Sequence, residues 1–196
     1  MFIQTEETPN PLTLKFLPGR AVMEAGSAEF ASVEEAQASP LAEALFDLAG
    51  VSRVFFGPDF ITVTKDSEAV DWRALRAPIL ASIMDHYTAG ETLFRGDEQA
   101  GERAGAAGHS DEAYEGEAAQ IVAEIKDLLD TRIRPAVAAD GGDILFSKYE
   151  PDTGILWLHM RGSCAGCPSS AMTLKAGVEN MLRHYVPEVT RVEQTV

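Results

Sequence analysis

The 196-residue sequence has few cysteines, two in all, and few basic residues, with 16 Lys and Arg against 31 Asp and Glu. Two cysteines three positions apart cannot cross-link a chain of this length, which excludes a secreted fold held together by disulfides. The formal net charge of -15 repels phosphate backbones and anionic lipid surfaces. We therefore expect neither nucleic acid nor a membrane surface among its partners.

Other signals are missing as well. No apolar run approaches the roughly 20 residues of a membrane-spanning helix. No segment matches G-x-S-x-G, the Walker A motif, G-x-G-x-x-G or H-E-x-x-H, so none of these catalytic or nucleotide-binding sites is indicated. Residues 1–7 are acidic and lack the basic region of a targeting signal. We expect a reducing cytoplasm, where paired cysteines are more often metal ligands or redox groups than bridges.

The composition is otherwise that of a globular protein, with 45% hydrophobic and 24% charged residues. The exception is residues 89–116, which contain six glycines and few apolar side chains. Such a segment cannot bury enough surface to offset its ordering entropy, so it is predicted to be a flexible linker. It would separate a first domain, residues 1–88, from a second, residues 117–196.

The first domain is predicted to be a small α+β fold. Apolar alternation and turn residues indicate strands at residues 2–5, 12–16, 51–56 and 60–64. A helix should start at Ser39-Pro40 and end before Gly50. A second helix, residues 72–87, contains Pro78, which should kink or restart it. No cluster of His, Cys or carboxylates has ligand spacing, so this domain shows no chemistry of its own.

The second domain is predicted to have the order αββαβ, a three-stranded sheet covered by two helices. The first helix, residues 121–133, should end or bend at Arg134-Pro135. Strands are expected at residues 144–149, 155–160 and 189–193, and the second helix at residues 172–185. Asp140 and Asp143 flank two glycines, and we interpret them as part of a turn rather than as paired catalytic carboxylates. The fold class is thus α+β, with two small α/β sandwiches.

The strand expected at residues 155–160 is apolar on both faces. Leu156, Leu158 and Met160 share one face, and Ile155, Trp157 and His159 share the other. The helices of the domain can cover only one of these faces. The other face is therefore predicted to be covered or to contact a partner.

The two cysteines, Cys164 and Cys167, form a Cys-x-x-Cys motif between an expected strand and an expected helix. Two intervening residues let a tight turn direct both sulfur atoms toward one point, and Gly162 and Gly166 allow the backbone to fold closely around a bound group. Pro168 suits the first helical position. The helix N-terminus favours the thiolate, which is the form that a soft metal requires.

Four interpretations of this motif remain open at this point. A [4Fe–4S] cluster takes four cysteine thiolates, so it would have to be shared by two chains of a homodimer. A thioredoxin-like dithiol occupies the same place between strand and helix. Zinc would need further ligands, and the nearby His159 and His184 lack zinc-finger spacing. An inert buried pair is the fourth, but the flanking Gly and Pro residues argue against it. The pattern favours the cluster.

Longer stretches resemble a known family. Residues 134–143 (RPAVAADGGD) and 160–170 (MRGSCAGCPSS) make residues 117–192 similar to the NifU C-terminal domain, also called the Nfu domain. Residues 1–88 resemble the Nfu N-terminal domain through residues 3–6, 8–11 and 54–63. The resemblance covers almost the whole chain except the expected linker.

This resemblance implies a non-enzymatic iron–sulfur carrier or scaffold. It implies that Cys164 and Cys167 are the ligands of a [4Fe–4S] cluster bridged between two chains, with a homodimer in the cluster-bound form. It also implies that an upstream scaffold supplies the cluster and that apo iron–sulfur proteins receive it, with the N-terminal domain contributing to client recognition. The compartment would be a bacterial cytoplasm, or the mitochondrial matrix for a processed eukaryotic protein.

Overall fold

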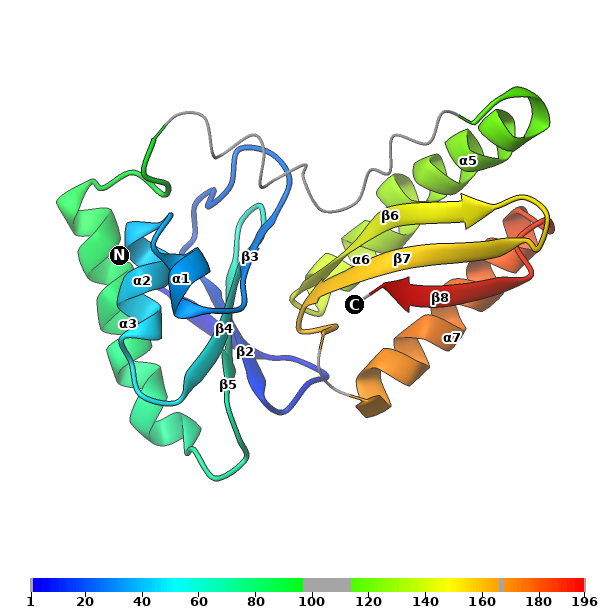
Figure 1. Cartoon of the computed structure of the whole chain (residues 1–196). Helices are drawn as coiled ribbons and strands as arrows, with labels where there is room; N and C mark the ends of the chain where they lie inside the picture. The colour runs from blue at the N-terminus through cyan, green and yellow to red at the C-terminus, as the bar shows by residue number, and fades with distance from the viewer. Residues whose placement is uncertain (1, 97–113, 166–167, 196) are drawn as a thin grey trace. The chain divides into compact units, whose positions relative to one another are not determined.

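The computed structural model describes residues 2–96, 114–165 and 168–195, with the backbone alone for residues 168–171 (Figure 1). The chain divides into two compact units, residues 1–104 and 105–196, and each is described by itself. Most of the expected linker, residues 97–113, lies outside the described residues. An α+β fold with two units agrees with the sequence analysis.

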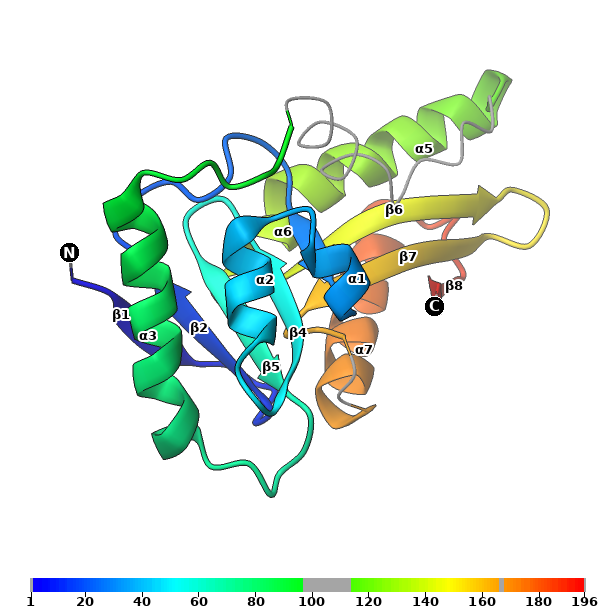
Figure 2. The same ribbon diagram turned by 60° about the vertical axis from the view of Figure 1, so that its left-hand side comes forward.

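The N-terminal unit is a five-stranded antiparallel sheet with helices packed on one face (Figures 1 and 2). Apolar side chains of α2 and α3, including Leu45 and Ile79, share one core with Phe16 and Phe56 of the sheet. In chain order the elements are β1 (Gln4–Glu7), β2 (Thr13–Leu17), β3 (Ala28–Phe30), α1 (Val33–Ala36), α2 (Pro40–Phe46), β4 (Val51–Phe56), β5 (Ile61–Lys65) and α3 (Trp72–Ala89). The strand order is β1-β2-β5-β4-β3.

Two helices of this unit contain prolines whose effects were predicted from the sequence. Helix α2 begins as predicted, with Pro40 in its first turn and the Ser39 hydroxyl accepting a hydrogen bond from the Ala42 amide at 3.2 Å. Helix α3 runs through Pro78 as one helix, so of the kink or restart expected there, the restart is wrong. Burial of Leu75 and Ile79 on either side of Pro78 offsets the roughly 3 kcal/mol that an interior proline costs.

The chain remains packed on the N-terminal core beyond α3. Gly90 ends the helix in the left-handed conformation, with a φ of 67°. Phe94 is buried in the core, and the Arg95 amide donates to the Ala38 carbonyl at 2.8 Å. The structure differs here from the linker expected from residue 89, because the apolar Leu93 and Phe94 bring the segment back onto the unit.

The C-terminal unit has the predicted order αββαβ. Its sheet runs β6-β7-β8, with β6 antiparallel and β8 parallel to β7. All the helices pack on one face, and the core between them and the sheet includes Ile125, Val137, Leu158 and Leu182 (Figures 1 and 2). The elements are α5 (Gly116–Leu128), η1 (Leu129–Ile133), α6 (Arg134–Ala139), β6 (Gly142–Glu150), β7 (Ile155–Gly162), α7 (Pro168–Tyr185) and β8 (Arg191–Thr195).

On each free edge of this sheet, a side chain binds one backbone amide. On the β6 edge, the Tyr149 amide donates to the Tyr114 hydroxyl at 2.9 Å. On the β8 edge, the Val192 amide donates to a Glu179 carboxylate oxygen at 2.9 Å. Unpaired edge amides are the groups through which sheets join edge to edge, so these two contacts disfavour such pairing.

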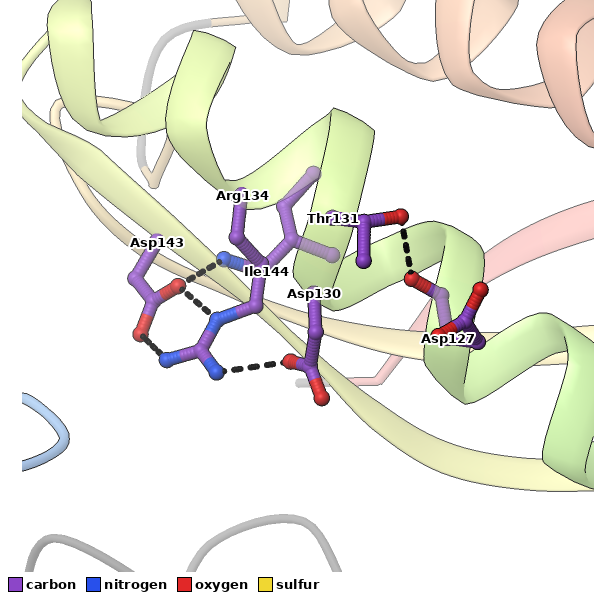
Figure 3. A network of polar contacts seen from close by, with 6 residues as sticks. All are labelled: Asp127, Asp130, Thr131, Arg134, Asp143 and Ile144. Carbon is purple, nitrogen blue, oxygen red and sulfur yellow. Dashed lines mark hydrogen bonds and ion pairs between the residues drawn. The ribbon is translucent and has the colours of Figure 1, made fainter.

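The first helix of this unit does not end at Arg134-Pro135, which was one of the two outcomes expected there. Residues 129–133 form a π-helical turn, η1, and the helix then resumes as α6 to Ala139. Pro135 lacks an amide and its ring crowds the preceding turn, which favours the wider geometry. The Thr131 hydroxyl also donates to the Asp127 carbonyl at 2.7 Å, a contact that bends helices (Figure 3).

Candidate functional site

Cys164 lies in the turn between β7 and α7, where the sequence placed it. Strand β7 ends at Gly162 and α7 begins at Pro168, so the predicted helix start at that proline is confirmed. The Cys164 side chain is 5% exposed and belongs to the core of the C-terminal unit. Cys167, the second predicted ligand, lies outside the described residues, so the separation of the two sulfur atoms is not described.

The sulfur of Cys164 packs directly on Gly142, the first residue of β6. A Cβ added to Gly142 would overlap the Cys164 Sγ and would lie 2.8 Å from the Arg161 carbonyl oxygen. Atoms cannot approach so closely without displacement of the backbone. The second glycine of the Asp-Gly-Gly-Asp stretch, Gly142, therefore leaves room for the sulfur of the buried cysteine because it has no side chain.

Hydrogen bonds hold the cysteine turn against the chain that precedes β6. The Ser163 hydroxyl donates to the Asp140 carbonyl at 2.6 Å, and the Ser163 amide donates to the Gly141 carbonyl at 3.1 Å. Within the turn, the Ala165 amide donates to the Gly162 carbonyl at 3.1 Å. Asp140 and its glycine neighbour thus position the turn through their backbone, in keeping with the prediction that Asp140 is a turn residue.

Asp143 behaves differently from the prediction, because it lies in β6 and is bound by Arg134 of α6 (Figure 3). Arg134 donates from Nε to Asp143 Oδ1 at 2.8 Å and from Nη2 to Oδ2 at 3.0 Å, and from Nη1 to Asp130 at 2.9 Å. The Ile144 amide also donates to Asp143 Oδ1 at 2.9 Å. These hydrogen bonds, the one to Asp143 foremost, raise the pKa of Arg134 above its usual value.

The Arg134–Asp143 pair fixes the start of β6 to the start of α6, one residue from Gly142. The sequence analysis did not find it, because the partners are nine positions apart and meet only when the chain reverses at Asp140-Gly141. The sequence did contain a signal for this pair, namely an arginine followed by an Asp-Gly-Gly-Asp turn that could bring an aspartate back to it.

The histidines considered as zinc ligands do not gather at the cysteine turn. Half-buried His159 has its Nδ1 3.4 Å from the Thr195 hydroxyl, and His184 is exposed beside Tyr185. In residues 2–96, 114–165 and 168–195, no three His, Cys, Asp or Glu side chains form a group that could hold a metal ion. No helix in that part of the chain is long and apolar enough to cross a membrane.

The fold and the site define a two-domain α+β protein with a cysteine turn at a strand–helix junction. Residues 3–90 match the family model "Scaffold protein Nfu/NifU N terminal", and residues 125–193 match the "NifU-like domain". The human protein "NFU1 iron-sulfur cluster scaffold homolog, mitochondrial" is 48% identical over 196 residues, which are 100% of this chain and 72% of that protein. The chain belongs to the Nfu/NifU-like family, which confirms the resemblance stated from the sequence.

Other proteins are similar to the chain. "NifU-like protein 4, mitochondrial" of Arabidopsis thaliana is 53% identical over 194 residues, which are 99% of this chain and 66% of that protein. The chain therefore spans about two thirds of the length of this relative. A solution structure of a NifU-like protein from Saccharomyces cerevisiae aligns at 27% identity with a TM-score of 0.44, covering 49% of this chain and 86% of that one.

Proposed function

We propose that the protein carries an iron–sulfur cluster and delivers it to apo-proteins, without catalysing a reaction. The support is the combination of family membership and a cysteine turn built into the fold. The human relative is named an iron–sulfur cluster scaffold homolog, which makes a cluster the natural cargo for these thiols. The packing of Cys164 is the observation that carries the proposal. The missing side chain at Gly142 leaves the space in which the Cys164 sulfur lies.

The cargo we propose is a [4Fe–4S] cluster shared by two chains. Such a cluster takes four thiolates, and Cys164 and Cys167 supply two per chain. A homodimer with the cluster on its two-fold axis completes the ligand set. The cluster-bound form would then be a dimer, and an incoming client thiolate could displace one ligand at a time.

The buried state of Cys164 adds a requirement to this proposal. A thiol that is 5% exposed and packed on Gly142 cannot reach iron held by a second chain. Loading therefore requires the turn to leave Gly142 and to break the Ser163 hydrogen bonds to Asp140 and Gly141. Each of these two hydrogen bonds is worth about 1 kcal/mol, so opening the turn costs about 2 kcal/mol in hydrogen bonds in addition to the packing of Cys164 on Gly142.

The partners follow from the cargo: a scaffold that supplies clusters, apo iron–sulfur proteins that receive them, and a second copy of the chain. We propose that the N-terminal unit takes part in client recognition, since it carries no cysteine of its own. Of the two compartments left open by the sequence, the mitochondrial matrix is the one that the names of the relatives support.

Anaerobic reconstitution with iron and sulfide tests the cargo. We expect a brown protein with about four irons and four sulfides per dimer and the Mössbauer signature of a [4Fe–4S] cluster. Cys164→Ser and Cys167→Ser should each abolish binding. His159→Gln and His184→Gln are matched controls that remove the alternative zinc ligands, and both should retain the full cluster.

A colourless protein that reduces insulin disulfides would overturn the carrier and favour the dithiol oxidoreductase. Stoichiometric cluster in either cysteine variant would refute the ligand assignment. Loss of bound iron in the histidine variants, with iron retained in the cysteine variants, would assign the ligands to the histidines instead.

A further inference from the structure

The face of the C-terminal sheet opposite its helices carries an ordered set of side chains. In Figure 1 this sheet lies in front of α5, α6 and α7, with its helix-free face toward the viewer. The strand register places the residues of this face in rows across β6, β7 and β8. The rows are Glu150–Ile155–Arg191, Lys148–Trp157–Glu193 and Leu145–His159–Thr195.

These rows have an apolar centre and a charged rim. Ile155 and Trp157 stand on the central strand and are half-buried, and among the residues that the structure describes no helix of this unit packs on their face. The outer strands contribute four charged residues, which within one copy already pair along each strand, Lys148 with Glu150 at 3.5 Å and Arg191 with Glu193. An apolar, tryptophan-containing centre within a polar rim is the usual anatomy of a protein–protein interface.

The charges of the rim have opposite signs on the two sides of β7. Lys148 on β6 stands across Trp157 from Glu193 on β8, and Glu150 on β6 stands across Ile155 from Arg191 on β8. A half-turn about a line parallel to β7, lying in the plane of contact, exchanges the β6 side with the β8 side. Each cation of one copy then faces an anion of the other.

A second symmetry also leaves these charges attractive. A half-turn about a line perpendicular to β7 over the Trp157 row would place Lys148 over Lys148, which costs energy by like-charge repulsion. A perpendicular line midway between the two charged rows would instead place Lys148 over Glu150 and Glu193 over Arg191, and mixing the charge-reversed variants separates that arrangement from the parallel one. Edge-to-edge pairing is disfavoured because Tyr114 and Glu179 already bind edge amides of β6 and β8. The self-complementary pattern is the one that an isologous two-fold contact requires.

We propose that this helix-free face docks a second copy of the chain, face to face, with β6 of each copy opposite β8 of the other. The contact uses no cysteine and no iron, so it goes beyond the proposed cluster-bridged dimer. It can be tested independently of that dimer. Strand β7 has 8 residues, and at about 3.3 Å per residue and about 4.8 Å between strands the face measures about 26 by 15 Å. That is roughly 400 Å² per copy, half of a standard interface, so we expect a weak, concentration-dependent dimer.

Charge reversal tests the symmetry in the metal-free, reduced, full-length protein. Sedimentation velocity from about 10 to about 500 micromolar should show a monomer–dimer equilibrium for the wild type. In Lys148→Glu, two glutamates face each other twice across the axis, and in Glu193→Lys two lysines do so. We expect each variant alone to raise the dimer dissociation constant at least about tenfold.

An equimolar mixture of Lys148→Glu and Glu193→Lys gives the decisive measurement. In the mixed dimer, both charge pairs are attractive again, so association should recover to within about threefold of wild type. Arg76→Glu, an exposed position on α3, makes the same charge change as Lys148→Glu away from the face and should leave the equilibrium unchanged. Charge reversal is preferable to added salt, because salt also screens the net charge of -15.

The Lys148 and Glu193 variants must fold for the test to count, since Glu193 also binds Lys175 at 2.6 Å. If either variant loses its cooperative thermal transition, the second pair, Glu150→Lys mixed with Arg191→Glu, makes the same test at the other charged row. In a Trp72→Phe background, the fluorescence of Trp157 should become less accessible to iodide as concentration rises.

A sedimentation coefficient that is constant up to the highest concentration would overturn the proposal and leave the face to another partner. A mixture that associates no better than its components would overturn the parallel two-fold symmetry. Because no iron is present, neither result bears on whether Cys164 and Cys167 bind a cluster.

Discussion

The two units share one plan, helices against one face of a sheet, but they treat buried polar groups differently. In the C-terminal unit, the carboxylate of Asp143 is held by Arg134 and by the Ile144 amide. In the N-terminal unit, the Thr62 hydroxyl, the His86 Nδ1 and the Tyr87 hydroxyl are buried without a hydrogen-bond partner. Within the part of the chain that the structure describes, these are the buried side-chain atoms without a hydrogen bond, and all belong to the N-terminal unit.

The difference shows which unit tolerates buried polar groups without a hydrogen bond. The cysteine turn rests on the first residues of β6, so any slack there would move the thiol of Cys164. The paired Asp143 next to Gly142 holds that strand start in place. Neither cysteine belongs to the N-terminal unit, whose buried groups without a hydrogen bond lower its own stability. Each unit carries one of the two tryptophans, Trp72 and Trp157, so the unfolding of each can be followed separately.

The largest effect should come from Gly142→Ala. The new methyl group would meet the Cys164 Sγ and the Arg161 carbonyl, so we expect a loss of about 3 kcal/mol of stability in the C-terminal unit. Urea unfolding followed by Trp157 in a Trp72→Phe background measures it. Gly177→Ala is the matched control, since an exposed helical glycine with open space around it should gain about 0.5–1 kcal/mol. Equal changes in stability for the two variants would show that the packing of Cys164 does not require a glycine at position 142.

An intermediate effect on stability is expected from Asp143→Ala. This variant leaves buried polar groups of the C-terminal unit without a hydrogen bond, as is already the case for Thr62, His86 and Tyr87 in the N-terminal unit. The variant leaves the Arg134 guanidinium and the Ile144 amide without their shared acceptor, at a cost of about 2 kcal/mol. The same Trp157 unfolding curve reports it. Asp130→Ala removes only the exposed partner of Arg134 and should cost less than about 0.5 kcal/mol. If Asp143→Ala were equally mild, the contrast between the units would not rest on hydrogen bonding.

The smallest effect should be the pH dependence that His86 gives to the N-terminal unit. Burial lowers the pKa of His86 below 6.5, and Glu91, whose carboxylate lies 3.6 Å away, only partly opposes this. The unfolded state then binds the proton more readily, so stability is full above pH 6.5 and falls as the pH drops toward the folded-state pKa.

Urea midpoints at pH 7.5 and 5.5, followed by Trp72 in a Trp157→Phe background, measure this dependence. His86→Gln should flatten it, whereas His184→Gln, at an exposed position in the other unit, should preserve it. A dependence that survives in His86→Gln would assign it to a different group.

Local signals in the sequence were sufficient for much of the fold. Strand β4 has the predicted bounds, because its apolar run lies between Gly50 and Gly57. The start of α2 and the junction that holds Cys164 follow from Ser-Pro and Cys-Pro signals of the same local kind. These features depend on neighbours in the chain, which a sequence displays directly.

What the sequence did not show depends on contacts between distant residues. Strand β3 has three residues, too few for a pattern, and exists because Phe30 pairs with Val54 of β4. The burial of Phe94 and the Arg134–Asp143 pair likewise arise only after the chain has folded back. The burial of Cys164 on Gly142 belongs with these, because no spacing indicates that a cysteine of the motif is buried in the core.

The π-helical turn at Leu129–Ile133 has a consequence for how the chain can change over evolutionary time. Such a turn amounts to one extra residue in an otherwise α-helical segment. Removing that residue would restore the regular helix and rotate everything after it by about a quarter of a turn or more. Arg134 would then leave the side of the helix from which it reaches Asp143. The length of this helix is thus constrained as tightly as the identity of its residues, so insertions and deletions should accumulate elsewhere.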